Sequence, residues 1–452
     1  MSFVETIVAP ATPRGESALA VVRLSGPLAG EVATALNHDR APLPRRVWHG
    51  DYRSISGGVI DDAVFCFFAG PGSYTGEDLL EISSHGNPYI VRKILEDLIA
   101  RGCRMAEAGE FTRRAFLNGR LDLTAAEAVM DVIRARSDRA LDAARQQLRG
   151  ALGRRIDRLV GDLLQCCAAI EAYIDFPEDD LPPEDRDRRR VEIATLLGEL
   201  GRLQSTRRHH ELLREGLSVV LLGAPNAGKS SLLNRLAGYE RAIVSEEPGT
   251  TRDFLEEPVL LGPHRIRVID TAGLREATAA VEQAGVMRSL ERAEGADLVV
   301  LVVDAGMPCP TLPVIVQERL VEKHAVIAVN KCDLAQRSFS WPGSGLLAQI
   351  EVSAHTGAGI DELRRTLVDL ADQLTGSGGD EEHVAVNARH AAALAEAADC
   401  LERADRLLAE SGPLELVGSE LRAAVGAMGG IVGRIDHEQI LDRLFSSFCI
   451  GK

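Results

Sequence analysis

Short runs of strand-forming residues alternate with Pro/Gly turns through the first part of the chain. The runs cover residues 6–9, 19–24, 64–68 and 79–83, and a helical pattern follows near residues 89–100. Apolar and β-branched runs bounded by Gly and Pro are typical of strands. We therefore expect an α+β domain over residues 1–118.

The pattern changes to helical spacing after this first domain. Apolar residues recur at that spacing from 121 to 173, then to about 214 after an acidic, proline-bearing stretch, and again from about 384 onward. Between 217 and 373, strands alternate with loops and helices, which is typical of a parallel-sheet α/β domain. The sequence therefore predicts a helical domain split into residues 119–215 and 379–452, with an α/β domain inserted at residues 216–378.

Composition narrows the class of protein. The 452 residues carry a formal net charge of -16, which argues against a protein that coats nucleic acid along its whole surface. No run approaches the roughly 18 apolar residues of a membrane span, and the first residues lack a signal-peptide pattern. The eight cysteines show no zinc-ligand spacing. We expect a multidomain cytoplasmic protein that does not bind membranes.

One segment of the inserted domain predicts a phosphate site. GAPNAGKS fits the pattern G-x-x-x-x-G-K-[ST] at Gly223, Gly228, Lys229 and Ser230, between an apolar strand and a helical pattern. Glycines let backbone N–H groups surround the phosphates, Lys229 neutralises phosphate oxygens, and the Ser230 hydroxyl suits Mg²⁺. On its own, the match is also compatible with a glycine-rich turn that fits the pattern by chance.

Three further motifs follow in the order of a GTPase. DTAG begins at Asp270, which suits a magnesium-bound water, and VSAHTG supplies a base-supporting loop around Ser353. NKCD lies between them, and the Asp333 carboxylate can accept both hydrogens that guanine offers and adenine does not. Adenine would leave this polar group buried and unpaired, so a site of this kind can reject the wrong base by a factor on the order of 10⁴. The four motifs together predict GTP binding.

A switch segment and a catalytic helper complete the expected nucleotide site. In EEPGTTRD, Thr250 or Thr251 can close over the phosphate, and we expect Thr251 to bind Mg²⁺. The residue after DTAG is Leu274, which cannot orient a water, so hydrolysis needs another group. Glu282 is near enough in sequence to act through a water, although a lone Glu there is also typical of a solvated surface.

Several segments together resemble the MnmE family, also called TrmE, of GTPases that modify the wobble uridine of tRNA. They include IVAPATPRGESALAVVRLSG, GPGSYTGEDLLEISSHG, GEFTRRAFLNGRLDLTAAEAV, DTAGLREA and the C-terminal FSSFCIGK, so the resemblance covers essentially the whole chain. It implies a homodimer formed through N-terminal domains that each bind a tetrahydrofolate. It also implies G domains that pair when GTP binds, with K⁺ in the role of an arginine finger.

The resemblance also assigns residues. It places the catalytic role on Glu282. Cys449, close to the chain end, is either a reactive thiol near the folate or a semi-buried residue of the tail. The folate positions fall on Arg23, Glu81, Arg120 and Lys452, and the K⁺ positions on Asn226, Ser245, Glu247 and Thr250. With the motifs above, the expected nucleotide contacts are Asn226, Ala227, Gly228, Lys229, Ser230, Ser231, Ser245, Glu246, Glu247, Pro248, Gly249, Thr250, Thr251, Asp270, Thr271, Ala272, Gly273, Asn330, Lys331, Asp333, Ser353 and Ala354.

The resemblance further implies a function. A flavoprotein partner resembling MnmG would act with this chain on tRNA to form an aminomethyl or carboxymethylaminomethyl group at carbon five of the wobble uridine. The cofactors would be GTP, Mg²⁺, K⁺ and 5,10-methylenetetrahydrofolate, with 5-formyltetrahydrofolate as an analogue. The alternatives are an RNA- or ribosome-associated GTPase switch without modification chemistry, and a folate enzyme with a regulatory GTPase.

Overall fold

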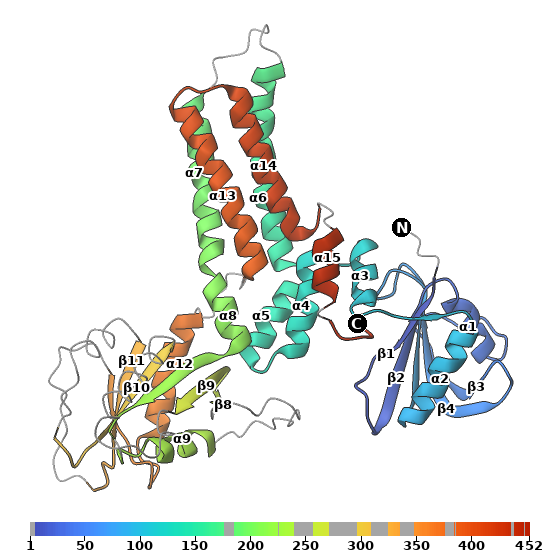
Figure 1. Ribbon diagram of the computed structural model, residues 1–452, viewed down its shortest axis with the longest axis horizontal. Helices are drawn as coiled ribbons and strands as arrows, with labels where there is room; N and C mark the ends of the chain where they lie inside the picture. The colour runs from blue at the N-terminus through green and yellow to red at the C-terminus, as the bar shows by residue number, and fades with distance from the viewer. Residues whose placement is uncertain are drawn as a thin grey trace. The chain divides into compact units, whose positions relative to one another are not determined.

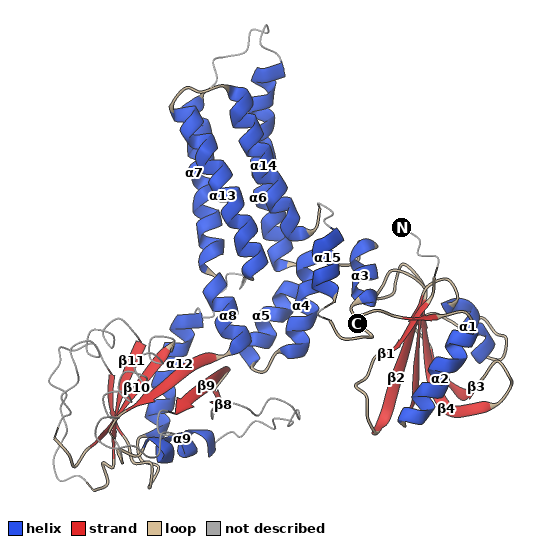
Figure 2. Cartoon of the chain, viewed as in Figure 1, coloured by secondary structure: helices blue, strands red, loops and turns tan. Residues whose placement is uncertain are grey.

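The computed structural model describes most of the chain and divides it into two compact units. The described residues are 5–175, 185–224, 226–238, 256–270, 296–308, 324–334, 348–375, 384, 386–434, 438–446 and 448–452. One unit comprises Met1–Met130, Gln147–Gly198 and Ala392–Lys452, and the other comprises Asp131–Gln146 and Glu199–Ala391. Each unit is described by itself (Figures 1 and 2).

A six-stranded sheet with helices on one face forms the N-terminal part of the first unit. The strand order is β3-β4-β5-β2-β1-β6, antiparallel except for the β1–β6 pair. Its elements are β1 (Ile7–Pro10), β2 (Ser17–Ser25), α1 (Ala29–Leu36), β3 (Val47–Arg53), β4 (Val59–Phe68), β5 (Leu79–Gly86), α2 (Pro88–Ala100) and β6 (Arg104–Met105). Asn87 caps α2 by accepting from the Tyr89 amide, and Pro88 opens the helix, which is a favourable helix start.

The two faces of this sheet differ in burial. Phe65, Leu80 and Ile82 point to the side covered by α1 and α2 and join one apolar core with Ile94 and Leu98 of α2. Side chains alternate along strands, so the residues between them, including Arg23 and Glu81, face the opposite side. The open face of the sheet is therefore available for a site or a partner.

Helices complete the first unit. The long helices α6, α7, α13 and α14 run side by side, with ion pairs between Arg190 and Asp405 and between Arg422 and Glu171 (Figure 1). Segments far apart in sequence, among them Leu123, Leu441 and Phe445, share a second apolar core. The helices that lie wholly or mostly in this unit are α3 (Glu110–Leu117), α4 (Leu123–Arg134), α6 (Ala151–Asp175), α7 (Arg186–Ser205), α13 (Ala388–Ala409), α14 (Leu414–Val432) and α15 (Glu438–Phe445). Helix α5 (Asp138–Leu148) belongs almost entirely to the second unit.

The second unit contains the predicted mainly parallel sheet. The strand order is β12-β11-β10-β7-β9-β8, and only β8 runs antiparallel to its neighbour. Its elements are α8 (Arg207–Glu215), β7 (Leu217–Leu222), α9 (Lys229–Gly238), β8 (Glu256–Leu261), β9 (His264–Asp270), β10 (Leu298–Asp304), β11 (His324–Asn330), β12 (Ala348–Glu351) and α12 (Ile360–Thr375). The predicted fold class, an α+β part, a split helical part and an inserted α/β part, is confirmed.

Candidate functional site

The predicted phosphate loop lies at the carboxyl end of β7, where parallel α/β sheets bind ligands. A Cβ on Gly223 would lie 2.2 Å from the carbonyl oxygen of Val302, and one on Gly228 would lie 2.1 Å from Nδ2 of Asn330. Gly223 and Gly228 also have φ of +149° and +94°, and Asn226 has φ of +64°. Only glycine combines this conformation with this close approach, so the loop backbone is fixed by its sequence.

The lysine of the loop is buried and directed at the loop backbone. Lys229 Nζ donates to the carbonyl oxygens of Gly223 at 2.8 Å and Ala224 at 3.0 Å. Ser230 and Ser231 follow it in the first turn of α9, and both are exposed. The helix start therefore presents an ammonium group, hydroxyls and backbone N–H groups together, which is the donor set that a phosphate requires.

One buried side chain joins three of the predicted motifs. Asn330 ends β11 and is 2% exposed. Its Nδ2 donates to the carbonyl oxygen of Ala227 at 2.8 Å, and its Oδ1 accepts from the Ala354 amide at 3.1 Å. The phosphate loop, the NKCD motif and the base-supporting loop are thus held in one hydrogen-bonded unit.

The residues around Asn330 leave the base-reading carboxylate open. Lys331, with φ of +64°, contacts Asp304 through Nζ at 2.6 Å, and this hydrogen bond lowers the pKa of Asp304. Ser353 is fully buried and its Oγ accepts from the Thr356 amide at 3.0 Å, which shapes the loop that carries Ala354. Asp333 is exposed. The carboxylate predicted to read the base is therefore exposed beside a hydrogen-bonded loop.

The remaining nucleotide predictions concern the neighbouring strand and two segments outside the described residues. Asp270 ends β9, paired in register with Leu221 of β7, so its backbone lies beside the start of the phosphate loop. Residues 245–251 and 271–273, together with Glu282, lie outside the described residues. Their roles remain predictions. Among the residues that the structure describes, no cluster of three or more His, Cys, Asp or Glu could hold a metal ion.

A second group of predicted residues meets on the open face of the N-terminal sheet. Arg23 of β2 and Glu81 of β5 are direct cross-strand partners, and Arg23 donates to Glu81 Oε1 from Nη2 at 2.6 Å and Nε at 3.0 Å. The Arg23 guanidinium also lies 5.6 Å from the Tyr74 ring centre and 5.9 Å from that of Phe111. These distances allow cation–π attraction, which further fixes the guanidinium.

The C-terminal residues reach the same place. Ile450 forms a β-bridge with Ala108, and the Gly109 amide donates to the Cys449 carbonyl oxygen at 3.4 Å. A Cβ on Gly451 would lie 2.2 Å from the carbonyl oxygen of Pro10, so a larger residue would displace this segment. Burial, together with the charge of Arg23, lowers the pKa of the Lys452 amine, while the charge of Glu81 opposes this effect.

The structure thus brings together Arg23, Glu81 and Lys452, as the resemblance implied, with the exposed thiol of Cys449 three residues before Lys452. Arg120 lies against the neighbouring loop, where its Cγ would be 3.3 Å from a Cβ on Gly76. Sequence reasoning did not single out Tyr74 or Phe111. Both aromatic residues stand in the quoted segments GPGSYTG and GEFTRR, which was the available signal.

Two cations beside a carboxylate suit one kind of ligand. Guanidinium and ammonium groups bind carboxylates through charge-assisted hydrogen bonds, and a fixed carboxylate accepts from paired ring N–H donors. The side chains of Arg23 and Glu81 are only 16% and 30% exposed, so these bonds would form in a partly desolvated place. A pterin with a glutamate tail offers both kinds of partner, and the donor set fits it.

Comparison with known proteins identifies the family. The "MnmE helical domain" family matches residues 123–449, and "GTP-binding protein TrmE N-terminus" matches residues 6–120. The tRNA modification GTPase MnmE of Opitutus terrae is 49% identical over 449 residues, 99% of this chain and 99% of that protein.

A second relative and one solved structure complete the comparison. The tRNA modification GTPase MnmE of Halorhodospira halophila is 44% identical over 457 residues, 99% of this chain and 96% of that protein. The G domain of the T. maritima FeoB iron transporter is 28% identical, with a TM-score of 0.26, and covers 34% of this chain and 98% of that domain. Full-length identity and two matching domain families together show that this chain belongs to the MnmE family.

Proposed function

We propose that this chain is a GTP-hydrolysing enzyme of tRNA modification. Family membership supports the activity. Within this chain, the proposal rests on the hydrogen bonds of Asn330, which join the phosphate loop to the motif proposed to read guanine. With a flavoprotein resembling MnmG, the enzyme would form an aminomethyl or carboxymethylaminomethyl group at carbon five of the tRNA wobble uridine.

In the proposed nucleotide cycle, this chain's residues bind and orient the GTP. Lys229 exchanges its bonds to Gly223 and Ala224 for phosphate oxygens, and Asp333 selects guanine. Ser230 and Thr251 would hold Mg²⁺, and Asn226, Ser245, Glu247 and Thr250 would hold K⁺. Bound cations stabilise the negative charge that develops on the phosphates. An arginine finger that provides this stabilisation accelerates hydrolysis by a factor of roughly 10³ to 10⁵. Glu282 would orient the attacking water.

The N-terminal cluster is the proposed folate site. Arg23, Arg120 and Lys452 would bind the glutamate carboxylates of the ligand, and Glu81 would accept from the pterin N–H edge. The folate would supply the one-carbon unit to the uridine. The exposed Cys449 lies in the segment that brings Lys452 to this cluster, and in this proposal its thiol takes part in that transfer.

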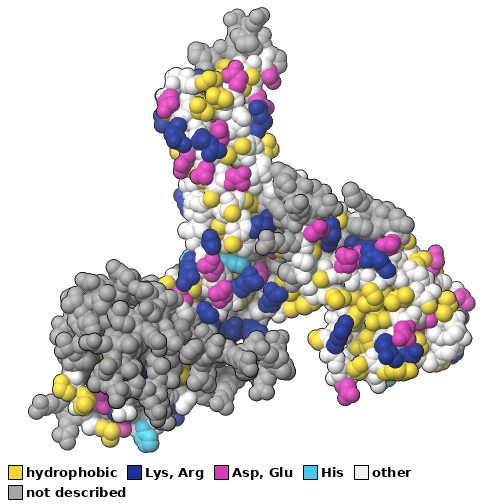
Figure 3. All heavy atoms as spheres, viewed as in Figure 1, with side chains coloured by type: hydrophobic (Ala, Val, Ile, Leu, Met, Phe, Trp, Pro, Cys, Tyr) yellow, Lys and Arg dark blue, Asp and Glu magenta, His cyan; other side chains and the backbone are white. Residues whose placement is uncertain are grey.

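The open face of the N-terminal sheet is the proposed homodimer interface. Leu19, Val47 and Val64 are 63%, 62% and 38% exposed, although all three are apolar. Figure 3 shows that hydrophobic side chains also gather on the side of this part of the chain that faces the viewer, where α2 lies in Figure 1. Exposed apolar patches commonly mark interaction surfaces.

None of the described helices is long and apolar enough to cross a membrane. We propose a cytoplasmic location.

The alternative is a GTPase switch that binds RNA or ribosomes and performs no modification chemistry. The nucleotide motifs permit this function, but it gives no role to the cation–carboxylate cluster on the N-terminal sheet. Binding of 5-formyltetrahydrofolate to the full chain separates the two, because a switch has no use for a pterin. Loss of that binding in Glu81→Ala would assign it to the proposed cluster.

The test of the proposed function is nucleoside mass spectrometry of tRNA from cells that lack this gene. We expect the wobble modification to disappear and to return with the wild-type chain. Glu282→Ala should not restore it, although this variant should still bind GTP. Persistence of the modification without the gene would favour the switch instead.

A further inference from the structure

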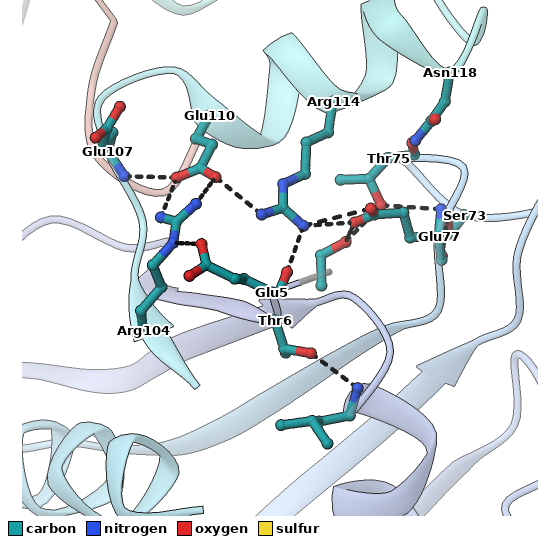
Figure 4. Close-up of polar contacts among 12 residues, drawn as sticks. Glu5, Thr6, Ser73, Thr75, Glu77, Arg104, Glu107, Glu110, Arg114 and Asn118 are labelled. Carbon is teal, nitrogen blue, oxygen red and sulfur yellow. Dashed lines mark hydrogen bonds and ion pairs between the residues drawn. The ribbon is translucent and has the colours of Figure 1, made fainter. Parts of the chain in front are cut away.

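A buried chain of charges runs beside the cation–carboxylate cluster. Arg114 of α3 is 1% exposed, and its guanidinium contacts Glu110 Oε1 at 2.9 Å and Glu77 Oε2 at 3.1 Å (Figure 4). It also donates to the carbonyl oxygen of Glu5 at 2.9 Å, just before β1. Arg104 contacts the outer side of Glu110 through two nitrogens, at 2.6 and 2.8 Å. No predicted role used any of these residues.

Glu77 connects this chain of charges to the loop between β4 and β5. Its Oε2 accepts from Ser25 Oγ at 2.8 Å, and Ser25 is hydrogen-bonded to Thr75 at 2.7 Å. Ser73 Oγ donates to the carbonyl oxygen of Glu77. Residues 73–77 are therefore held on one side to β2 and on the other to Arg114 of α3 (Figure 4).

The loop with residues 73–77 and helix α3, which this network joins, are also the segments that hold Arg23. Tyr74 lies in the loop and Phe111 lies in α3, and the rings of both lie beside the Arg23 guanidinium. The Tyr74 hydroxyl is hydrogen-bonded to Thr112 Oγ1 at 2.9 Å, so loop and helix also meet at the aromatic ring. A shift of α3 relative to the loop would separate the rings and release the guanidinium of Arg23.

We propose that the Glu77–Arg114–Glu110 chain is a positioning network that holds Arg23 and Glu81 in the orientation that binds the folate. The inference rests on the proposed folate site and adds residues that do not touch the ligand. Buried ion pairs contribute little net stability, since apolar residues of similar volume commonly stabilise a fold as well. In some proteins, buried ion pairs instead fix how two segments are placed relative to each other. A buried network that joins the loop between β4 and β5 to α3 fits that second use.

The experiment is calorimetric titration of the full chain with 5-formyltetrahydrofolate. Arg114→Lys keeps the charge but loses the fork that reaches Glu110, Glu77 and the Glu5 carbonyl together. Glu77→Ala removes the loop's anchor, and Glu77→Gln keeps an oxygen that can accept from Ser25 and Arg114. We expect Arg114→Lys and Glu77→Ala to weaken binding at least about tenfold, and Glu77→Gln to recover most of that loss.

Two controls distinguish an effect on the position of Arg23 from a general loss of stability and from damage to the nucleotide site. Tyr52→Phe removes a buried 2.8 Å hydrogen bond to Asp97 in the same domain but touches neither the loop nor α3. At a matched loss of thermal stability it should keep wild-type affinity for the folate. GTP hydrolysis should stay unchanged in the Arg114, Glu77 and Tyr52 variants. If Glu77→Ala does not yield folded protein, Arg114→Lys and Glu77→Gln still carry the test.

The outcomes are distinguishable. If the wild-type chain does not bind the folate, or if Glu81→Ala binds it equally well, the proposed site is wrong. If the wild type binds, Glu81→Ala does not, and Arg114→Lys matches the wild type, the site stands and the positioning network is rejected. Equal losses in Tyr52→Phe and Arg114→Lys would also reject it, because stability alone would then explain the effect.

Discussion

Nδ2 of Asn330 lies 2.8 Å from the carbonyl oxygen of Ala227, so the NKCD motif, proposed to read guanine, is hydrogen-bonded directly to the phosphate loop. We predict that Asn330→Asp weakens binding of GTP and GDP alike. The variant keeps an acceptor for the Ala354 amide but places a carboxylate oxygen against a carbonyl oxygen. A buried unpaired polar group costs about 1–3 kcal/mol, which corresponds to roughly 5- to 150-fold in affinity.

Equilibrium titration with a fluorescent GDP analogue measures this effect. Wild-type affinity in Asn330→Asp would show that the two motifs do not depend on this contact. Thermal unfolding of the nucleotide-free variant reports how much of the loss comes from the fold of the second unit.

Gly228→Ala should abolish nucleotide binding for a steric reason. The added Cβ would lie 2.1 Å from Asn330 Nδ2, and φ of +94° is strained for alanine. The matched control is Gly198→Ala in α7, where a Cβ meets nothing within 4 Å. That change should be neutral or stabilise the protein by about 0.5–1 kcal/mol, because alanine favours helix. Nucleotide binding by Gly228→Ala at wild-type strength would contradict the described loop.

Asp333→Asn should change which base is bound. The amide can accept only one hydrogen from guanine and places a donor where guanine offers the second. Xanthine carries a carbonyl oxygen in place of that exocyclic amine, so it should bind the variant better than guanine does. Competition between GTP and XTP for the wild type and the variant measures the switch. A variant that keeps its preference for GTP would remove Asp333 from the base site.

Glu110 should make the N-terminal domain sensitive to acid. Burial raises the pKa of this carboxyl, but hydrogen bonds from Arg104, the Glu107 amide and Arg114 outweigh burial and hold the pKa below its usual value. Since the unfolded chain then binds the proton more readily, the stabilisation is present above the ordinary glutamate pKa. It is lost as pH falls through the lowered pKa of the folded state.

Unfolding by urea at pH 7 and near pH 4 tests this prediction. Glu110→Gln should be less stable than the wild type at pH 7, and the difference should shrink at the lower pH. Glu96→Gln is the control, since Glu96 forms an exposed pair with Lys93 in the same domain and such pairs contribute little. A constant difference between Glu110→Gln and the wild type at both pH values would refute the assignment.

The nucleotide site could be predicted because each of its motifs is a short continuous segment whose order fixes its place at the ends of parallel strands. The proposed folate cluster could not be derived this way. Arg23 and Glu81 meet only through the register of β2 and β5, and Lys452 arrives from the far end of the sequence. A family resemblance named these residues, whereas no local pattern did.

The positioning network was hidden for the same reason. Arg114, Glu77 and Glu110 look like surface charges in a linear sequence. Only the packing of α3 against the loop buries Arg114 and Glu110 and covers most of Glu77. The expected elements also omitted α1 and β3. The first is only eight residues long, and the second is interrupted by glycine and charged residues, which weaken a strand pattern.

The split helical bundle has a consequence for protein synthesis. Helix α6 packs along α14, yet the whole inserted nucleotide unit is translated between them. At about 5–20 residues per second, the ribosome needs on the order of tens of seconds to cover that interval. The N-terminal sheet has all its strands by Met105 and can fold at once, while the apolar stripe of α6 waits for its partner. During translation, this stripe therefore lacks its α14 partner until the C-terminal helices have been synthesised.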